Sequence, residues 1–302
     1  MSYAGGNPQF PVGSPGLDPR APVPSGDRGS KILEPLRAEG ARGVAIAVVS
    51  TVVVFGLIAF AVLTSSGWPA IKEAFFDPTI FWDSLSKIME KFSRNVFIFL
   101  VAEVFVLILA LILAVMRSLR GPVFTPLRIL AAAYTDLFRA VPTILVILLL
   151  GFGAPSLQLK GVPHSDVFWA IVALILVYSA YVAEVYRAGI QSVHPSQVAS
   201  ARALGLSRGK TMRFVVVPQA VRRVLPPLLN DFIGLQKDSA LVAVLGYTEA
   251  LRQAQIISAA EFDFTPYVAL ALVYIVITIP EARFVDWLVA RDQRRRQAAG
   301  GV

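Results

Sequence analysis

The chain alternates between long apolar stretches and shorter polar ones, a pattern typical of a protein that crosses a membrane several times. A membrane-spanning helix needs about 20 mainly apolar residues. The stretches that reach or approach this length cover residues 44–63, 95–116, 129–152, 167–186, 224–245 and 266–279. The hydrophobic fraction of 56% and the mean hydropathy of +0.65 are too high for a soluble protein of 302 residues. The sequence therefore predicts an all-α integral membrane protein with about six transmembrane helices.

Basic residues are concentrated in alternate loops. Residues 117–128, 187–223 and 291–296 hold three, seven and four Lys or Arg, whereas residues 153–166 and 247–265 hold one each. Loops rich in Lys and Arg stay on the cytoplasmic side of a membrane. A multi-pass protein of the cell membrane with both termini in the cytoplasm satisfies every one of these comparisons.

The ends of the chain differ from its middle. The beginning is rich in Pro and Gly, so we expect residues 1–40 to form a disordered cytoplasmic tail. Residues 41–94 are expected to add a transmembrane helix and, over residues 81–92, an amphipathic helix among the lipid headgroups. Residues 95–290 then form the main transmembrane domain, and residues 291–302 form a basic cytoplasmic tail.

The stretch over residues 224–245 is the least apolar of the six and carries Asn230, Lys237 and Asp238. Polar and charged groups are expensive in lipid and face a protein interior or a water-filled path instead. We therefore interpret these three residues as lining a substrate pathway. The alternative is that some of them lie at the membrane surface, because prolines break and shorten this helix.

Two pairs of opposite charges lie one helical turn apart inside predicted spans: Asp136 with Arg139, and Glu184 with Arg187. An ion pair would lower the free energy of placing these charges at membrane depth. We expect both pairs to form near the cytoplasmic ends of their helices and to hold these helices in register; a role in gating is the alternative. Pro142 is expected to kink the span over residues 129–152, since proline removes a backbone donor.

The basic loop over residues 190–222 contains a short helix that we place at residues 197–204. Ser196 is a suitable N-cap, and Gly205 suits the left-handed position after the last turn. Ser207 is then expected to cap a second helix that Pro218 closes. A slim helix that ends at a glycine can dock into a groove of a partner; an ordinary pair of interfacial helices is the alternative.

Composition argues against several other classes of protein. The chain has no Cys and two His, which makes a metal site improbable, and no His, Asp and Glu constellation indicates an enzyme. Its net charge of +8 comes from loops rather than from a binding face, so nucleic acid is not expected as a partner. Residues 205–211 lack the spacing of a phosphate-binding loop, so we expect no cofactor on this chain.

The 190–222 loop resembles the signature loop of ABC-importer permeases, which reads Glu-Ala-Ala, three residues, then Gly. Its aligned residues here are Ala199, Ser200, Ala201 and Gly205. The flanking residues 183–193 and 225–242, together with Arg139-Ala140-Val141-Pro142, are similar to the polar amino-acid family, of the histidine, glutamine and glutamate type. The resemblance runs from about residue 95 to residue 287.

This resemblance implies a type I ABC importer permease-like core in a bacterial cell membrane. The chain would form the substrate pathway for polar amino acids and would not itself be an enzyme. Its implied partners are cytoplasmic ABC ATPase subunits that bind ATP and Mg²⁺, a second permease subunit, and an extracytoplasmic substrate-binding protein. The residues implied in coupling to the ATPase are Ala199, Ser200, Ala201, Arg202, Leu204 and Gly205. Ala199 departs from the family pattern, because it replaces the leading Glu.

A self-sufficient secondary transporter for amino acids or other small polar solutes is the alternative function. Such transporters are commonly built from repeated halves with paired broken helices. The sequence contains one broken polar helix, over residues 224–245, and no matching second half.

Overall fold

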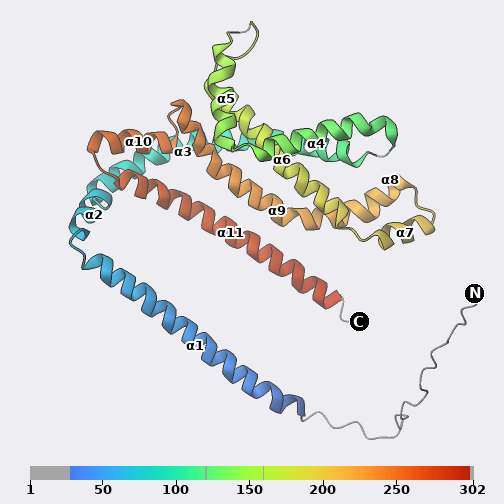
Figure 1. The fold of residues 1–302 in the computed structure, drawn as a ribbon, viewed down its shortest axis with the longest axis horizontal. Helices are drawn as coiled ribbons and strands as arrows, with labels where there is room; N and C mark the ends of the chain where they lie inside the picture. Colours follow the sequence, from blue (N-terminus) through green and yellow to red (C-terminus); the bar gives the residue numbers. More distant parts are fainter. Residues whose placement is uncertain (1–27, 120, 159, 300–302) are drawn as a thin grey trace, which may run out of the picture. The chain divides into compact units, whose positions relative to one another are not determined.

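A computed structural model of the chain describes residues 28–299 except for residues 120 and 159. Within these residues the regular elements are all helices (Figure 1). The chain divides into two compact units, Met1–Trp68 and Pro69–Val302. The all-α fold that the sequence predicts is confirmed.

The first unit contains one long helix, α1 (Arg28–Leu63). The part from Arg42 to Leu63 is long and apolar enough to cross a membrane, and its side chains are exposed. The helix begins inside the stretch that was expected to be a disordered tail. Residues 31–39 contain several Leu, Ala and Glu, which favour helix over the Pro-rich beginning. Residues 1–27 of that predicted tail lie outside the described residues.

The second unit begins inside α2 (Trp68–Phe75), after its first residue, and continues with the long helix α3 (Pro78–Ser118). Asp77 caps α3, because its Oδ1 accepts hydrogen bonds from the amides of Thr79 and Ile80 at 2.7 and 3.0 Å. The predicted amphipathic helix and the following span are therefore parts of one helix.

The amphipathic segment is predicted to lie among lipid headgroups, and this stays a prediction. Trp82 and Met89 on its apolar face are exposed, but part of the segment is covered by the protein. Ile88 and Phe92 of α3 are buried in a cluster with residues of α10 and α11. Small side chains on the facing helix α10, such as Ala250 and Ala254, let the helices approach closely around Ile88 and Phe92.

The span predicted over residues 129–152 is broken into α4 (Thr125–Ala140) and α5 (Thr143–Ser156), which meet at 101°. Val141 has an extended backbone, which is the conformation that a residue before proline prefers. Pro142 then stands at the N-cap of α5. The predicted disruption at Pro142 is confirmed. It is a complete break rather than a kink, because one helix ends at Ala140 and another begins at Thr143.

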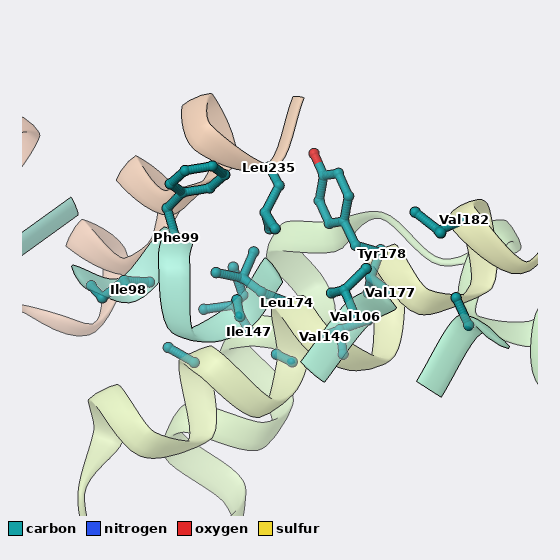
Figure 2. Packing of buried hydrophobic residues seen from close by; sticks show 14 of the residues in the cluster. Ile98, Phe99, Val106, Val146, Ile147, Leu174, Val177, Tyr178, Val182 and Leu235 are labelled. Atoms are coloured by element: carbon teal, nitrogen blue, oxygen red, sulfur yellow. The ribbon is translucent and has the colours of Figure 1, made fainter. Parts of the chain in front are cut away.

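The helix α6 (Asp166–Gln191) lies at the centre of the second unit, where it packs against α3, α4, α5 and α9. Figure 2 shows side chains from α3, α5, α6 and α9 converging on this core. Four buried alanines on α6, Ala170, Ala173, Ala180 and Ala183, allow its neighbours to pack closely. The remaining elements are α7 (Pro195–Ala203), α8 (Arg208–Thr211), a π-helical turn (Met212–Val216), α9 (Val217–Asp238), a 3₁₀ segment (Ser239–Leu245), α10 (Ala250–Glu261) and α11 (Thr265–Ala299).

Four helical segments of the described residues are long and apolar enough to cross a membrane, or five if the bent pair α4 and α5 forms one span. The four segments are Arg42–Leu63, Trp68–Ser118, Asp166–Gln191 and Thr265–Arg291. The stretch over residues 224–245 is not among them, because α9 is polar and ends at Asp238. At the C-terminal end, α11 continues through the basic residues to Ala299.

Candidate functional site

The 190–222 loop begins with the short helix α7. Its N-cap is His194, whose Nδ1 accepts a hydrogen bond from the amide of Ser196 at 3.2 Å. The prediction that Ser196 caps the helix is therefore wrong. Pro195 has the fixed backbone of a first helical residue, so the cap falls at His194, two positions before Ser196. The Ser196 hydroxyl instead lies 2.6 Å from the same His194 nitrogen.

The end of α7 is a glycine stop, as predicted. Gly205 has a left-handed backbone with φ of +83°. Its amide bonds the carbonyl of Arg202 at 3.0 Å, and the amide of Leu206 bonds the carbonyl of Ala201 at 3.2 Å. This pair of bonds defines a Schellman motif. No atom lies within 4 Å of where a Cβ of Gly205 would be, so the backbone conformation alone selects glycine.

The predicted coupling residues divide into two groups. Ala201 is buried against the next part of the loop, whereas Ala199, Ser200 and Arg202 are exposed. Leu204 is 84% exposed, which is unusual for a large apolar side chain on a well-defined turn. The outer face of α7 therefore offers small side chains and one apolar projection.

After this turn, Ser207 caps α8 as predicted, since its hydroxyl accepts a hydrogen bond from the amide of Lys210 at 3.3 Å. The prediction that Pro218 closes the second helix is wrong. Helical backbone continues from Arg208 through the π-helical turn into α9, and Pro218 lies in the first turn of α9. Proline has no backbone amide hydrogen to donate. The π-helical turn directly precedes Pro218, and there the amide of Val217 bonds the carbonyl of Met212.

This continuity links the loop to the membrane region without a flexible connection. The loop is also held to the end of α6, because Arg223 of α9 donates a hydrogen bond to the carbonyl of Ser192. A Cβ at Gly189 of α6 would overlap the side chain of Val224 of α9, so the two helices touch at this glycine. An open cavity of about 280 Å³ lies here, lined by Val185, Ala188, Gly189, Ser192, Arg223 and Pro227.

The predicted pair of Glu184 and Arg187 is present in the structure and is part of a larger network. Arg187 donates from Nη2 and Nε to Glu184 Oε2 at 2.6 and 2.9 Å. The sequence did not identify Arg117 of α3, which donates to Glu184 Oε1 and, at 2.9 Å, to Thr135 of α4. The network therefore joins α3, α4 and α6, and the only sequence signal for Arg117 was its place at the end of a span.

The predicted pair of Asp136 and Arg139 does not form. No ion pair joins these two described residues, and both side chains are exposed. The guanidinium of Arg139 instead lies over the ring of Tyr181, 5.8 Å from its centroid. The aromatic ring thus competes with Asp136 as a partner for the Arg139 cation, and helical spacing does not reveal such a partner.

The three predicted pathway residues lie on two faces of α9. Asn230 and Lys237 are seven residues apart, so they share one face, and both are exposed. Asp238 lies toward α6, where Tyr178 donates a hydrogen bond to its Oδ2 at 3.0 Å. Gly234 makes room for this contact, because a Cβ there would lie 3.2 Å from the Tyr178 hydroxyl. The structure thus does not bring Lys237 and Asp238 together.

Asp231 is a further polar group on α9 that sequence reasoning left out of the site. It lies seven residues before Asp238 and so shares its face. Its Oδ2 atom is buried and has no hydrogen-bond partner within the described residues. The face of α9 that is partly buried therefore carries two carboxylates, Asp231 and Asp238. The exposed face carries Asn230 and Lys237.

A second buried polar group lies at the start of α10, where Glu249 is the N-cap. Glu249 is fully buried and accepts hydrogen bonds from Asn95 Nδ2 at 2.7 Å and from the amides of Leu251 and Arg252 at 2.9 Å. Burial raises the pKa of Glu249 above its ordinary value, although these hydrogen bonds oppose the shift. No group of three or more His, Cys, Asp or Glu in the described part of the chain could hold a metal ion.

The chain is similar to known transport proteins over most of its length. The family described as binding-protein-dependent transport system inner membrane component matches residues 107–293. The probable glutamine ABC transporter permease protein GlnM of Bacillus subtilis is 35% identical over 218 residues, which cover 72% of this chain and 98% of GlnM. The arginine transport system permease protein ArtQ of the same organism is 38% identical over 175 residues, or 57% of this chain and 78% of ArtQ.

Solved structures resemble the chain in the same region. A crystal structure described as an amino acid ABC transporter with histidines is 31% identical, with a TM-score of 0.62, and the match covers 68% of this chain and 93% of that one. The MetNI methionine ABC transporter in an inward-facing conformation has a TM-score of 0.54 at 16% identity and covers 70% of this chain and 99% of that one. The second likeness concerns the fold alone.

Proposed function

Since this chain belongs to the family of inner membrane components of binding-protein-dependent transport systems, we propose that it is the permease subunit of an ATP-driven importer of polar amino acids. It forms the pathway through the bacterial cell membrane, and both of its termini are cytoplasmic. Relatives named for glutamine and arginine transport support the substrate class.

One observation carries the mechanism: helical backbone is continuous from Arg208, beside the glycine stop of α7, to Asp238. We propose that a push or pull on the exposed outer face of α7 passes through the turn at Gly205 into this continuous helix. It would then move α9, whose two faces carry Asn230 with Lys237 and Asp231 with Asp238. We propose that α7 is the coupling helix and that its outer face, with Leu204 projecting, contacts a cytoplasmic ATPase subunit.

The partners follow from this role. Two ATPase subunits bind ATP and Mg²⁺, while this chain binds no cofactor. A second permease subunit completes the pathway, and an extracytoplasmic binding protein delivers the amino acid. The alternative of a self-sufficient secondary transporter is not favoured, because the relatives above are named as permeases of ABC or binding-protein-dependent systems.

Cross-linking tests the docking of the ATPase directly. The chain has no native Cys, so a single cysteine at Leu204 can carry a photoactivated cross-linker in the assembled complex. We expect a cross-link to the ATPase that weakens when ATP closes the ATPase dimer. A matched cysteine at Val123, an equally exposed apolar residue outside the loop, should give none. Equal cross-linking from both positions, or none from Leu204, would refute the docking role.

A further inference from the structure

A group of aromatic side chains is exposed where α2 ends and where α10 turns into α11. These residues, named here the aromatic surface, are Phe75, Phe262, Phe264 and Tyr267. The rings of Phe75 and Phe264 stack with centroids 5.1 Å apart, and those of Phe264 and Tyr267 are 6.3 Å apart. Phe262, two residues before Phe264, is 93% exposed. The family comparison and the coupling mechanism assign no role to this surface.

The backbone beneath the aromatic surface is fixed by hydrogen bonds. The amide of Phe264 bonds the carbonyl of Ala74 at 2.7 Å, which joins the turn to α2. Asp263 is buried and accepts a hydrogen bond from the amide of Thr265 at 2.6 Å. The hydroxyl of Thr265 in turn accepts from the amide of Asp77 at 3.1 Å. These hydrogen bonds join the end of α2, the turn and the start of α11, whose ribbons lie near one another in Figure 1.

Phe262 adopts a conformation that its side chain does not favour. Its φ of 52° is left-handed, a region that glycine occupies readily and that a bulky side chain occupies at a cost in free energy. A glycine would be expected at such a helix end. A large apolar ring held outward in this way implies that the ring itself makes a contact outside the chain.

The position of the aromatic surface along the spans indicates what that contact is. Thr265 begins one of the candidate membrane spans, and α2 belongs to another, so the surface lies where two spans end. An exposed apolar row leads from it along one face of α11, through Leu272, Ile275, Val276 and Ile279. The surface is thus the continuation of an exposed apolar row on a candidate membrane span.

The residue types agree with a location at the boundary of the bilayer. Aromatic side chains are enriched where the hydrocarbon core meets the headgroups. Exposed charges that suit the headgroup layer flank the surface at Lys72, Glu73 and Glu261. We propose that the aromatic surface is a lipid-binding anchor that inserts Phe262 at the bilayer interface and fixes the depth of α10. This proposal depends on the chain being a membrane protein and is independent of which substrate it carries.

Depth-dependent fluorescence quenching tests this proposal. A single cysteine at Phe262 is labelled with an environment-sensitive fluorophore, and the full chain is reconstituted in phosphatidylcholine vesicles. The vesicles contain lipid with a spin label near the headgroup or, in a separate sample, near the end of the acyl chain. A cysteine at Glu261 reports the same depth with Phe262 intact, and a cysteine at Ser207 in the 190–222 loop is the control outside the bilayer.

We expect the probes at Phe262 and Glu261 to be quenched more strongly by the headgroup label than by the chain-end label, and more than the probe at Ser207. Quenching no greater than that at Ser207 would overturn the proposal. So would stronger quenching by the chain-end label, which would place the turn inside the hydrocarbon. If added binding protein shields the probe and lipid does not quench it, the surface docks a protein and the proposal is wrong.

Discussion

Asn95 of α3 and Glu249, the N-cap of α10, are joined inside the protein by a hydrogen bond of 2.7 Å between Asn95 Nδ2 and Glu249 Oε2. The other side of the Asn95 amide accepts a bond from the backbone of Ala250 at 3.0 Å. Asn95 therefore bonds two groups at the start of α10, the side chain of Glu249 and the backbone amide of Ala250. These bonds fix α10 against α3. Each polar atom in this arrangement lies where water does not compete for it, since both side chains are almost fully buried.

We predict that Asn95→Ala destabilises the protein, because it leaves the buried carboxylate of Glu249 and the amide of Ala250 each short of a partner. Leaving one buried group unsatisfied costs about 1–3 kcal/mol. Thermal unfolding of the purified protein in detergent, followed by the loss of its monodisperse peak, measures the effect. Ser93→Ala, an exposed change on the same helix, is the control and should leave the unfolding temperature unchanged. Equal unfolding temperatures for Asn95→Ala and wild type would contradict the prediction.

Glu249 also predicts a dependence of stability on pH. Its pKa is raised in the folded state, so the folded protein holds a proton that the unfolded chain has already lost. The contribution of Glu249 to stability therefore falls as the pH rises above the ordinary pKa of glutamate, and stays low above the folded pKa. In Glu249→Gln this contribution is absent. We expect the difference in unfolding temperature between wild type and Glu249→Gln to shift in favour of the variant as the pH rises; a constant difference would disprove the assignment.

Two glycines of the 190–222 loop form a matched pair for testing the proposed role of the turn at Gly205 in coupling. Gly205 and Gly209 both have open space where a Cβ would stand, but only Gly205 has a positive φ. Replacing Gly205 by Ala places a side chain in a left-handed backbone at a cost of about 1–2 kcal/mol. We predict that Gly205→Ala weakens the ATPase response to loaded binding protein, while Gly209→Ala leaves it unchanged. Equal responses of the two variants would remove the turn from the coupling path.

The hydrogen bond from Tyr178 to Asp238 provides two variants that distinguish a pathway role of Asp238 from a structural role. Asp238→Asn keeps the shape of the side chain and an acceptor for Tyr178, but removes the charge. We predict that Asp238→Asn lowers amino-acid uptake in proteoliposomes with the complex fully assembled. Tyr178→Phe keeps the charge and loses only the hydrogen bond, so its uptake should fall less. Failure of Asp238→Asn to assemble, with Tyr178→Phe equally affected, would indicate that the pair is structural.

Local backbone chemistry made part of this structure predictable. Gly205 could be identified as a stop because few other residues accept a left-handed backbone. The break at Pro142 follows from the preference of the preceding residue, Val141, for an extended conformation. Both features depend on residues that are neighbours in sequence, and both were predicted.

Features that depend on distant residues could not be predicted in this way. Arg117 and Glu184 are 67 residues apart in sequence, and they bond only because α3 and α6 pack together. The spacing of Asp136 and Arg139 suggested an ion pair, but the ring of Tyr181 on another helix competes for Arg139. Helical spacing shows which partners are within reach, and packing decides which contact forms.

The central claim, that this chain is the pathway of an ATP-driven importer, is tested most directly by uptake. The complex is reconstituted in proteoliposomes with its ATPase and binding protein, and no ion gradient is imposed. We predict that labelled glutamine or arginine accumulates only when both ATP and the binding protein are present. Uptake by this chain alone, driven by an ion gradient without ATP, would contradict the account and identify a secondary transporter.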